Sequence, residues 1–326
     1  MKRIFSILFL LVLVLSCLTA CGAGTAAIGA SNDGKIHIVT TIFPEYDWVR
    51  NIVGEEAENV EITMLLDNGV DLHSFQPTVD DILKISTCDL FIYVGGNSDK
   101  WVDDALREAT NKNMIVIDLM DVLGDIVREE EIVEGMEAEE EDEEEEGPEY
   151  DEHVWLSLRN AEVLVQSISD AIQKIDPEHA EAYKKNTDSY LNQLNDLDDK
   201  YKDVVSGAKR DTLLFGDRFP FRYLVDDYGL HYYAAFVGCS AESEASFDTV
   251  IFLAKKVDEL SLDAVLTLEG TNHKIAETIV QNTTSKDQKV MSVDSMQSTT
   301  SKDSLEGATY LSIMEKNLAV LKKALN

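Results

Sequence analysis

The sequence has 326 residues, 44% of them hydrophobic, and a formal net charge of −34 at pH 7. A chain of this length can bury a core without disulfide bonds, and its size favours two domains. The acidic balance excludes nucleic acid as a partner, because no basic patch is present to neutralise phosphates. It fits a cation ligand, although strong charge outside a cell often serves solubility alone.

The N-terminal residues predict export and lipid anchoring. Two basic residues precede an apolar stretch, Ile4–Leu15, that is too short to span a bilayer. The following Leu18–Gly22 resembles a bacterial lipobox, in which Cys21 is lipidated and becomes the mature N-terminus. We therefore expect residues 1–20 to be a lipoprotein signal peptide and residues 21–34 a lipidated, flexible tether. An ordinary secretory signal with an incidental cysteine is the alternative.

The other cysteines do not predict a disulfide framework. Cys17 leaves with the signal peptide, and Cys88 and Cys239 lie far apart in the sequence. We interpret Cys88 and Cys239 as small buried residues, because the chain is long enough to build its core without covalent links.

Residues 35–158 predict a first lobe in which short apolar strands alternate with helices. The predicted strands are Lys35–Thr41, Val60–Leu66, Asp89–Val94 and Met114–Ile117, and the predicted helices are Pro44–Val53, Thr78–Ser86 and Asp99–Ala109. Such alternation is typical of βαβ units with right-handed crossovers, which produce a parallel sheet.

Residues 207–326 repeat this pattern and predict a second lobe of similar design. Its predicted strands are Thr212–Phe215, Tyr232–Phe236, Ala264–Leu268 and Val290–Val293, and its predicted helices are Phe221–Asp227, Ser246–Leu260, Lys274–Gln281 and a long one from about Ser304 to Leu325.

Residues 159–206 predict two helices between the lobes. Asp176-Pro177 breaks the first, and the second contains neither glycine nor proline from Glu178 to about Val205. At the standard rise this second helix would be about 40 Å long, which is more than one lobe needs. The expected fold is therefore α/β, with two similar lobes that each hold a parallel β-sheet flanked by helices, joined by one long rigid helix.

Polar residues follow several of the predicted strands, at the sheet edge where parallel α/β proteins bind ligands. His73 and His153 follow strands of the first lobe, and Asp217, Glu269 and Asp294 follow strands of the second. If the lobes close on each other, imidazole nitrogens face carboxylate oxygens, which makes a divalent-metal site plausible. Each residue also has a structural interpretation: a loop histidine is often a surface residue, and Asp294 could cap a turn.

An acidic run leads directly into His153. Glu129–Glu152 contains sixteen Asp or Glu and no Lys or Arg. Its low hydrophobicity and single-sign charge predict a disordered loop. Two interpretations stay open: a solvated loop without a ligand, or an antechamber that gathers cations weakly beside the cleft.

Several of these segments together resemble a known family. GVDLHSFQPT, DEHVWLS, the long connector, and SVDS ahead of a C-terminal helix resemble the zinc- and manganese-binding proteins of bacterial ABC metal importers, the cluster A-I solute-binding lipoproteins. The resemblance covers nearly the whole mature chain. It implies two lobes joined by one rigid helix, a single divalent ion in the cleft, delivery to a membrane permease, and a charged loop before the second histidine ligand.

The resemblance also implies a ligand set. Carried over onto this sequence, it makes His73 the first ligand, His153 the second, and Asp294 the carboxylate that closes the site.

The third ligand departs from the family pattern. The family's histidine or glutamate falls on Arg218, which has no lone pair to donate. Asp217 is the nearest candidate in the sequence; alternatively, water or Glu269 completes the shell, or Glu269 supports it from outside. Leu72 and Glu152 stand where the family has proline before each histidine, and we expect them to loosen those loops.

The expected function is extracytoplasmic capture of Zn²⁺ and delivery to the permease of an ABC importer, by a monomer anchored to the cell membrane through Cys21. Zinc is favoured by intrinsic affinity, and Mn²⁺ stays open because a carboxylate-rich site suits a harder ion. We expect no enzyme. The alternatives are a surface adhesin and a secreted metallohydrolase with Glu269 as general base, although the HExxH motif of many such enzymes does not occur.

Overall fold

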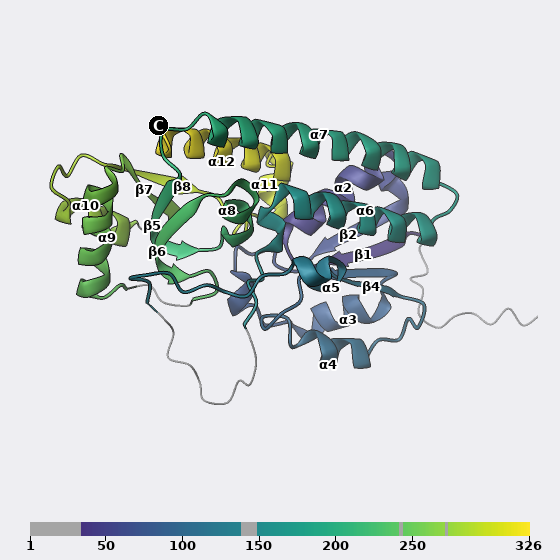
Figure 1. Cartoon of the computed structure of the whole chain (residues 1–326). Helices are drawn as coiled ribbons and strands as arrows, with labels where there is room; N and C mark the ends of the chain where they lie inside the picture. The colour runs from purple at the N-terminus through teal and green to yellow at the C-terminus, as the bar shows by residue number, and fades with distance from the viewer. Residues whose placement is uncertain (1–33, 138–148, 241–243, 271–272) are drawn as a thin grey trace, which may run out of the picture.

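The computed structural model describes residues 34–137, 149–240, 244–270 and 273–326 (Figure 1). The expected signal peptide, Cys21 and the centre of the acidic run lie outside the described residues. Within the described part of the chain, each helix is too short or too polar to cross a membrane.

The N-terminal lobe is built on a four-stranded sheet with the order β2-β1-β3-β4, and every neighbouring pair is parallel. Its strands are β1 (Ile36–Thr40), β2 (Val60–Met64), β3 (Leu90–Tyr93) and β4 (Ile115–Asp118), and its helices are α2 (Phe43–Val53), α3 (Val79–Thr87), α4 (Val102–Arg107) and α5 (Leu119–Leu123). The four predicted strands of this half are therefore all present.

The C-terminal lobe repeats this design with a parallel sheet of order β6-β5-β7-β8. Its strands are β5 (Thr212–Phe219), β6 (His231–Val237), β7 (Ala264–Leu268) and β8 (Lys289–Val293), and its helices are α8 (Arg222–Tyr228), α9 (Phe247–Leu260), α10 (Lys274–Asn282), α11 (Ser301–Leu305) and α12 (Tyr310–Ala324). The α/β architecture with two similar lobes is thus confirmed.

The C-terminal helix differs from the prediction of one continuous helix. The chain forms α11 and then α12, and Gly307 between them has a φ of 104°, a value that suits glycine and ends a helix. Thr309 then caps α12 by accepting a hydrogen bond from the Ser312 amide.

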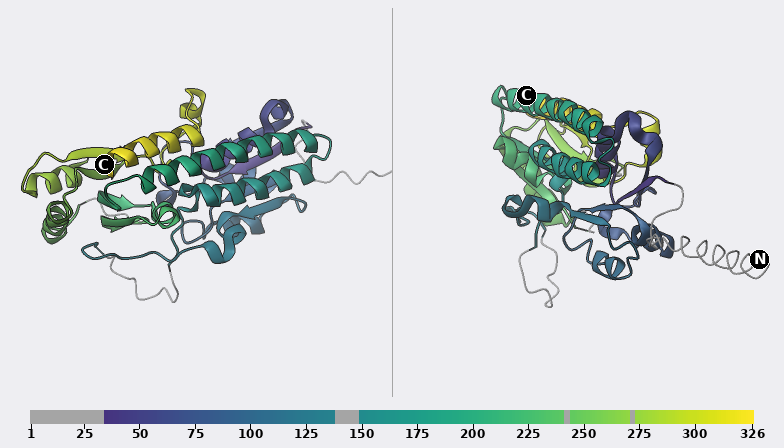
Figure 2. Two further views of the ribbon diagram at one scale, coloured as in Figure 1. Left: turned by 45° about the horizontal axis from the view of Figure 1, so that its top comes forward. Right: turned by 90° about the vertical axis from the view of Figure 1, so that its right-hand side faces the viewer.

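The long connector is α7 (Ala180–Ser206), which has 27 residues and follows α6 (Leu158–Ile175). Figures 1 and 2 show α7 running along both lobes. Near one end, the Asn186 side chain donates to the Ile52 carbonyl of the N-terminal lobe at 3.0 Å; near the other, the Tyr201 hydroxyl donates to the Met314 carbonyl of α12 at 2.7 Å. Because α7 is tied to both lobes, it limits how far they can move apart.

Three hydrogen bonds connect the two lobes around Tyr310 and Trp155. The Tyr310 amide donates to the Asp47 carboxylate at 3.0 Å, and the Tyr310 hydroxyl donates to the Trp155 carbonyl at 2.7 Å. The Trp155 indole in turn donates to the Ser295 carbonyl at 2.9 Å. The loop after β8 is therefore held against the segment that carries His153.

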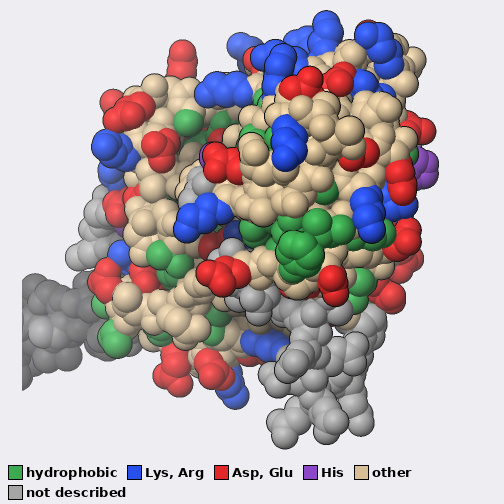
Figure 3. Space-filling view, turned by 90° about the vertical axis from the view of Figure 1, so that its left-hand side faces the viewer, with side chains coloured by type: hydrophobic (Ala, Val, Ile, Leu, Met, Phe, Trp, Pro, Cys, Tyr) green, Lys and Arg blue, Asp and Glu red, His purple; other side chains and the backbone are tan. Residues whose placement is uncertain are grey.

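The two flanks of the acidic run differ from the expectation of disorder over all of Glu129–Glu152. Residues 129–137 and 149–152 pair with each other through the bridge between Glu129 and Tyr150, and Glu137 bridges to Phe236 in β6. Acidic side chains do not dominate every face of the molecule. On the side formed by the C-terminal lobe, Figure 3 shows acidic and basic side chains interspersed.

Candidate metal centre

His73 lies in a short 3-10 helix after β2, and its local hydrogen bonds fix the ring. Asp71 caps this turn by accepting from the His73 amide at 3.0 Å. The His73 Nδ1 lies 2.7 Å from the Ser98 hydroxyl, and the side chain is only 13% exposed. With Nδ1 engaged, Nε2 is the ring nitrogen left to face the interior of the site.

His153 lies at the end of the acidic segment and is fully buried. One oxygen of Asp151 accepts from both the His153 amide, at 2.8 Å, and Nδ1, at 2.9 Å. The ring also packs against Trp155, with 5.2 Å between the centroids. A carboxylate on Nδ1 selects the tautomer that leaves a lone pair on Nε2, as metal-ligating histidines require.

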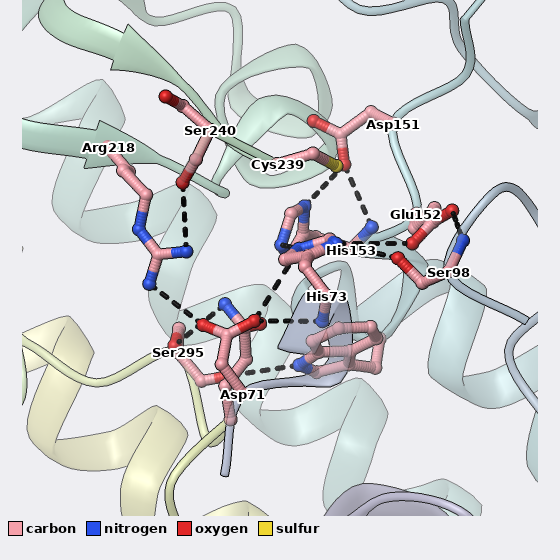
Figure 4. A network of polar contacts seen from close by, with 12 residues as sticks. Asp71, His73, Ser98, Asp151, Glu152, His153, Arg218, Cys239, Ser240 and Ser295 are labelled. Carbon is pink, nitrogen blue, oxygen red and sulfur yellow. Dashed lines mark hydrogen bonds and ion pairs between the residues drawn. The ribbon is translucent and has the colours of Figure 1, made fainter. Parts of the chain in front are cut away.

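The two imidazoles meet at a distance that suits a metal ion. The His73 and His153 Nε2 atoms are 3.3 Å apart. Figure 4 shows both side chains at the middle of the polar network. Two nitrogens bound to a tetrahedral zinc at 2.0–2.1 Å would be about 3.3 Å apart. The described residues thus place the two predicted histidine ligands side by side at ligand spacing.

Cys239 is the third residue at this centre. A ring nitrogen of each histidine and the Cys239 sulfur all lie within 4.8 Å of one another. The expectation that Cys239 is a small buried residue is not met, because its side chain is only half-buried and lies beside the two histidines. The signal that could have found it is its place directly after β6, because ligands gather where parallel strands end.

Arg218 occupies the C-terminal side of the centre. Its guanidinium forms an ion pair with Asp71 at 2.8 Å and donates to the Ser240 carbonyl at 3.3 Å. Figure 4 shows Arg218 reaching across from the C-terminal lobe toward Asp71. The side chain at the family's third-ligand position therefore links the two lobes.

Asp217 points into its own lobe. One of its oxygens accepts from the Thr267 hydroxyl at 2.6 Å and the Leu268 amide at 3.0 Å, and the other accepts from the Arg218 amide at 2.9 Å. A register shift between Phe215 and Arg218 distorts β5 at this point. Asp217 ties β5 to β7, and the structure does not gather it with the two histidines.

Glu269 and Asp294 are not part of the group in which ligand atoms of His73, His153 and Cys239 all lie within 4.8 Å of one another. The two Glu269 oxygens accept from the amide and the hydroxyl of Ser295, each at 2.7 Å. One Asp294 oxygen accepts from the Met296 amide at 2.8 Å. Burial, together with the neighbouring Asp294, raises the pKa of Glu269 to about 7.

Glu152 does not loosen its loop, contrary to the expectation from the missing proline. Its side chain is buried and accepts from the Ser98 amide at 2.8 Å, and its other oxygen lies 3.5 Å from His73 Nδ1. Leu72, the other replacement, is also buried in the 3-10 helix that carries His73. Leu72 and Glu152 therefore hold the two histidine loops through burial or hydrogen bonds, where the family has the rigid ring of a proline.

The charges around the histidines favour a pair that shares no more than one proton. Burial, with His153 close by, lowers the pKa of His73 to about 3. Burial also disfavours protonation of His153, but the carboxylates of Asp151, Glu152 and Asp71 together outweigh it and hold the pKa of His153 above its usual value. Burial and the Glu130 carboxylate raise the pKa of the Cys239 thiol.

The fold and the centre define a class: a protein of two parallel α/β lobes bridged by one long helix, with imidazole and thiol groups gathered between them. The chain belongs to the ZnuA family, described as zinc-uptake complex component A, periplasmic, whose family model matches residues 38–324.

Its relatives carry names of the same kind. The zinc-binding lipoprotein AdcA of Streptococcus pneumoniae is 33% identical over 297 residues, which are 89% of this chain and 56% of AdcA. The high-affinity zinc uptake system protein ZnuA of Bacillus subtilis is 27% identical over 330 residues, covering 100% of this chain and 99% of that protein. The chain spans only about half the length of the AdcA proteins it matches.

A solved structure shows the same fold. The crystal structure of the Zn(II)-bound ZnuA-like domain of S. pneumoniae AdcA superposes with a TM-score of 0.70 at 28% identity, covering 90% of this chain and 99% of that domain.

Proposed function

We propose that this protein captures one Zn²⁺ ion outside the cytoplasm and delivers it to the permease of an ABC importer. The observation that carries the proposal is the pair of Nε2 atoms 3.3 Å apart, each on a ring whose Nδ1 is hydrogen-bonded. Such pre-oriented imidazoles between two lobes suit capture of an ion without bond chemistry. Membership of a zinc-uptake family supports the same reading.

The cellular setting of the proposal rests on the sequence and the family. A lipid on Cys21 would anchor the protein to the cell membrane, and a monomer is sufficient because the centre is formed within one chain. The name of the AdcA lipoprotein supports the anchor. The permease partner follows from a family whose description is a component of a zinc-uptake complex.

Capture would need only small movements. His73 and His153 belong to the N-terminal lobe, whereas Arg218 and Cys239 belong to the C-terminal lobe, and α7 ties the lobes together. Loop shifts around this fixed frame would open and close the centre. Protons compete with the ion for His153, whose pKa lies above its usual value, so affinity should fall as pH drops below neutral.

The acidic run would act beside the centre. An open hollow is lined by acids of this run, including Glu129, Glu130 and Glu131, together with Asp118 and Gly96. Its wall adjoins the centre, because the Glu130 carboxylate accepts from the Cys239 amide at 3.2 Å. This continuity supports the antechamber interpretation, in which weakly held cations collect next to the cleft.

A zinc titration of the full chain after chelator treatment tests the proposal. We expect one zinc ion per chain with submicromolar affinity in calorimetry, and we expect His73→Ala and His153→Ala each to weaken binding severely. His231→Ala is the matched control, because His231 is exposed at the start of β6. Unchanged affinity in both site variants would refute the site, and hydrolytic activity that depends on zinc would favour the metallohydrolase alternative.

A further inference from the structure

We infer that Cys239 is a ligand of the captured ion, so that the centre binds through two imidazole nitrogens and one thiolate. The inference rests on the proposed metal capture and gives the site a chemical preference. It replaces the third ligand that the family pattern would put at Arg218, a side chain that has no lone pair.

The geometry places the sulfur where a third ligand is needed. Ring nitrogens of His73 and His153 and the Cys239 sulfur lie within 4.8 Å of one another. Zinc bonds nitrogen at 2.0–2.1 Å and sulfur at about 2.3 Å, so neighbouring ligand atoms of a tetrahedral ion are about 3.3–3.6 Å apart. Small side-chain rotations are enough to convert the observed cluster into that arrangement.

The backbone around Cys239 is fitted closely to His153. A methyl group on Gly238 would lie 3.0 Å from His153 Cε1 and 3.0 Å from the Phe219 carbonyl oxygen, so a side chain there would push against the ring and the neighbouring strand. On the other side of the cysteine, the Ser240 carbonyl accepts from Arg218 at 3.3 Å. Arg218 thus acts as a positioning residue that holds the Cys239 turn against the loop of His73 through Asp71.

The alternative acids face other partners. Asp217 is occupied by Thr267 and Leu268, and Glu269 by Ser295. Cys239 has to give up its proton and the contact between its thiol and the Glu130 carboxylate, but within the described part of the chain its side chain holds no bond to a neighbouring strand. On binding, the S–H bond breaks, the sulfur lone pair forms the bond to the ion, and the proton leaves to solvent.

A thiolate changes which ions the centre prefers. Soft thiolate ligands favour Zn²⁺, whereas carboxylate and water ligands suit Mn²⁺. The centre should therefore discriminate against Mn²⁺ more strongly than a site of two histidines and carboxylates would.

Cobalt spectroscopy of the full chain tests the inference, with a phosphine present to keep thiols reduced. Co²⁺ bound to the chelator-stripped protein should show the near-ultraviolet charge-transfer absorption of a thiolate ligand. Cys239→Ala should abolish that band, and Cys88→Ala should retain it, because Cys88 is buried in the N-terminal lobe away from the centre. Cys17 and Cys21 are common to every variant.

Zinc competition titrations complete the test. Cys239→Ala should weaken zinc binding by about 100-fold or more, beyond the 10–100-fold cost of losing a group that only supports a ligand. The ratio of zinc affinity to manganese affinity should also be lower in Cys239→Ala than in the unaltered chain. Cys239→Ser preserves the side-chain size and checks, by its melting curve, that folding is intact.

The outcomes separate this inference from the proposed function. Suppose the protein binds zinc tightly and one-to-one, but its Co²⁺ form lacks the charge-transfer band or keeps the band in Cys239→Ala. The thiolate ligand would then be overturned, and metal capture would stand. Absence of tight zinc binding in the unaltered chain would overturn both.

Discussion

The contact between Asp151 and His153 offers a sharp test of how the centre is preorganised. One buried oxygen of Asp151 accepts from both the amide and Nδ1 of His153, at 2.8 and 2.9 Å. Asp151→Asn keeps the size of the side chain but removes the charge that fixes the tautomer of the ring. The Nε2 lone pair would then face the ion for only part of the time.

The expected loss is that of a carboxylate supporting a metal-bound histidine. Such partners contribute about 10–100-fold in metal affinity, which corresponds to about 1.4–2.8 kcal/mol. The pKa of His153 should fall at the same time, because the nearby Asp151 charge contributes most to raising it against burial. Both changes have one cause and should appear together.

Competition with a chromophoric chelator at neutral pH measures the affinity, and NMR titration of the imidazole measures the pKa. Asp226→Asn is the matched control, since that carboxylate pairs with Arg128 and Arg222 and has no contact with either histidine. The reasoning fails if Asp151→Asn lowers the pKa of His153 yet binds zinc as tightly as the unaltered chain.

Three further predictions address residues outside the immediate centre. Asp217→Asn should lower thermal stability by weakening the bond to the Leu268 amide, yet change zinc affinity by no more than about threefold. If zinc affinity instead fell as much as in a histidine variant, Asp217 would be a ligand. Burial raises the pKa of Asp47 to about 6, so the folded protein binds this proton more tightly than the unfolded chain does. The free energy of unfolding should therefore fall by up to about 3 kcal/mol as pH rises from about 4 to 6. Asp47→Asn can still accept from the Tyr310 amide and should flatten that profile in urea unfolding, whereas parallel profiles would contradict the assignment. Replacing the acids of residues 138–146 by glutamine should leave the tight site intact while lowering the number of weak cation sites or the capture rate at low salt; no change in either would leave the solvated-loop interpretation.

The fold was predictable because its signals are local. Short apolar strands between helical patterns indicated both parallel sheets, and the absence of glycine and proline indicated the connector that became α7. The break between α11 and α12 was not predicted, because a single glycine such as Gly307 does not by itself end a helical pattern.

The site was predictable only in part, because side-chain direction depends on details that no sequence pattern shows. His73 and His153 follow strands of one sheet, and the rule for strand ends was enough to bring them together. Asp217 follows the same rule, but it lies within the register shift of β5 and its carboxylate is bonded within its own lobe. Cys239 was not predicted, because a single cysteine in a chain of this size is usually a small buried residue.

Anomalous scattering from zinc-loaded crystals tests the central claim most directly. The account predicts one strong zinc peak about 2.0–2.1 Å from a ring nitrogen of both His73 and His153, with the Cys239 sulfur at about 2.3 Å. A single zinc peak between Glu269 and Asp294, with both imidazoles unbound, would contradict it.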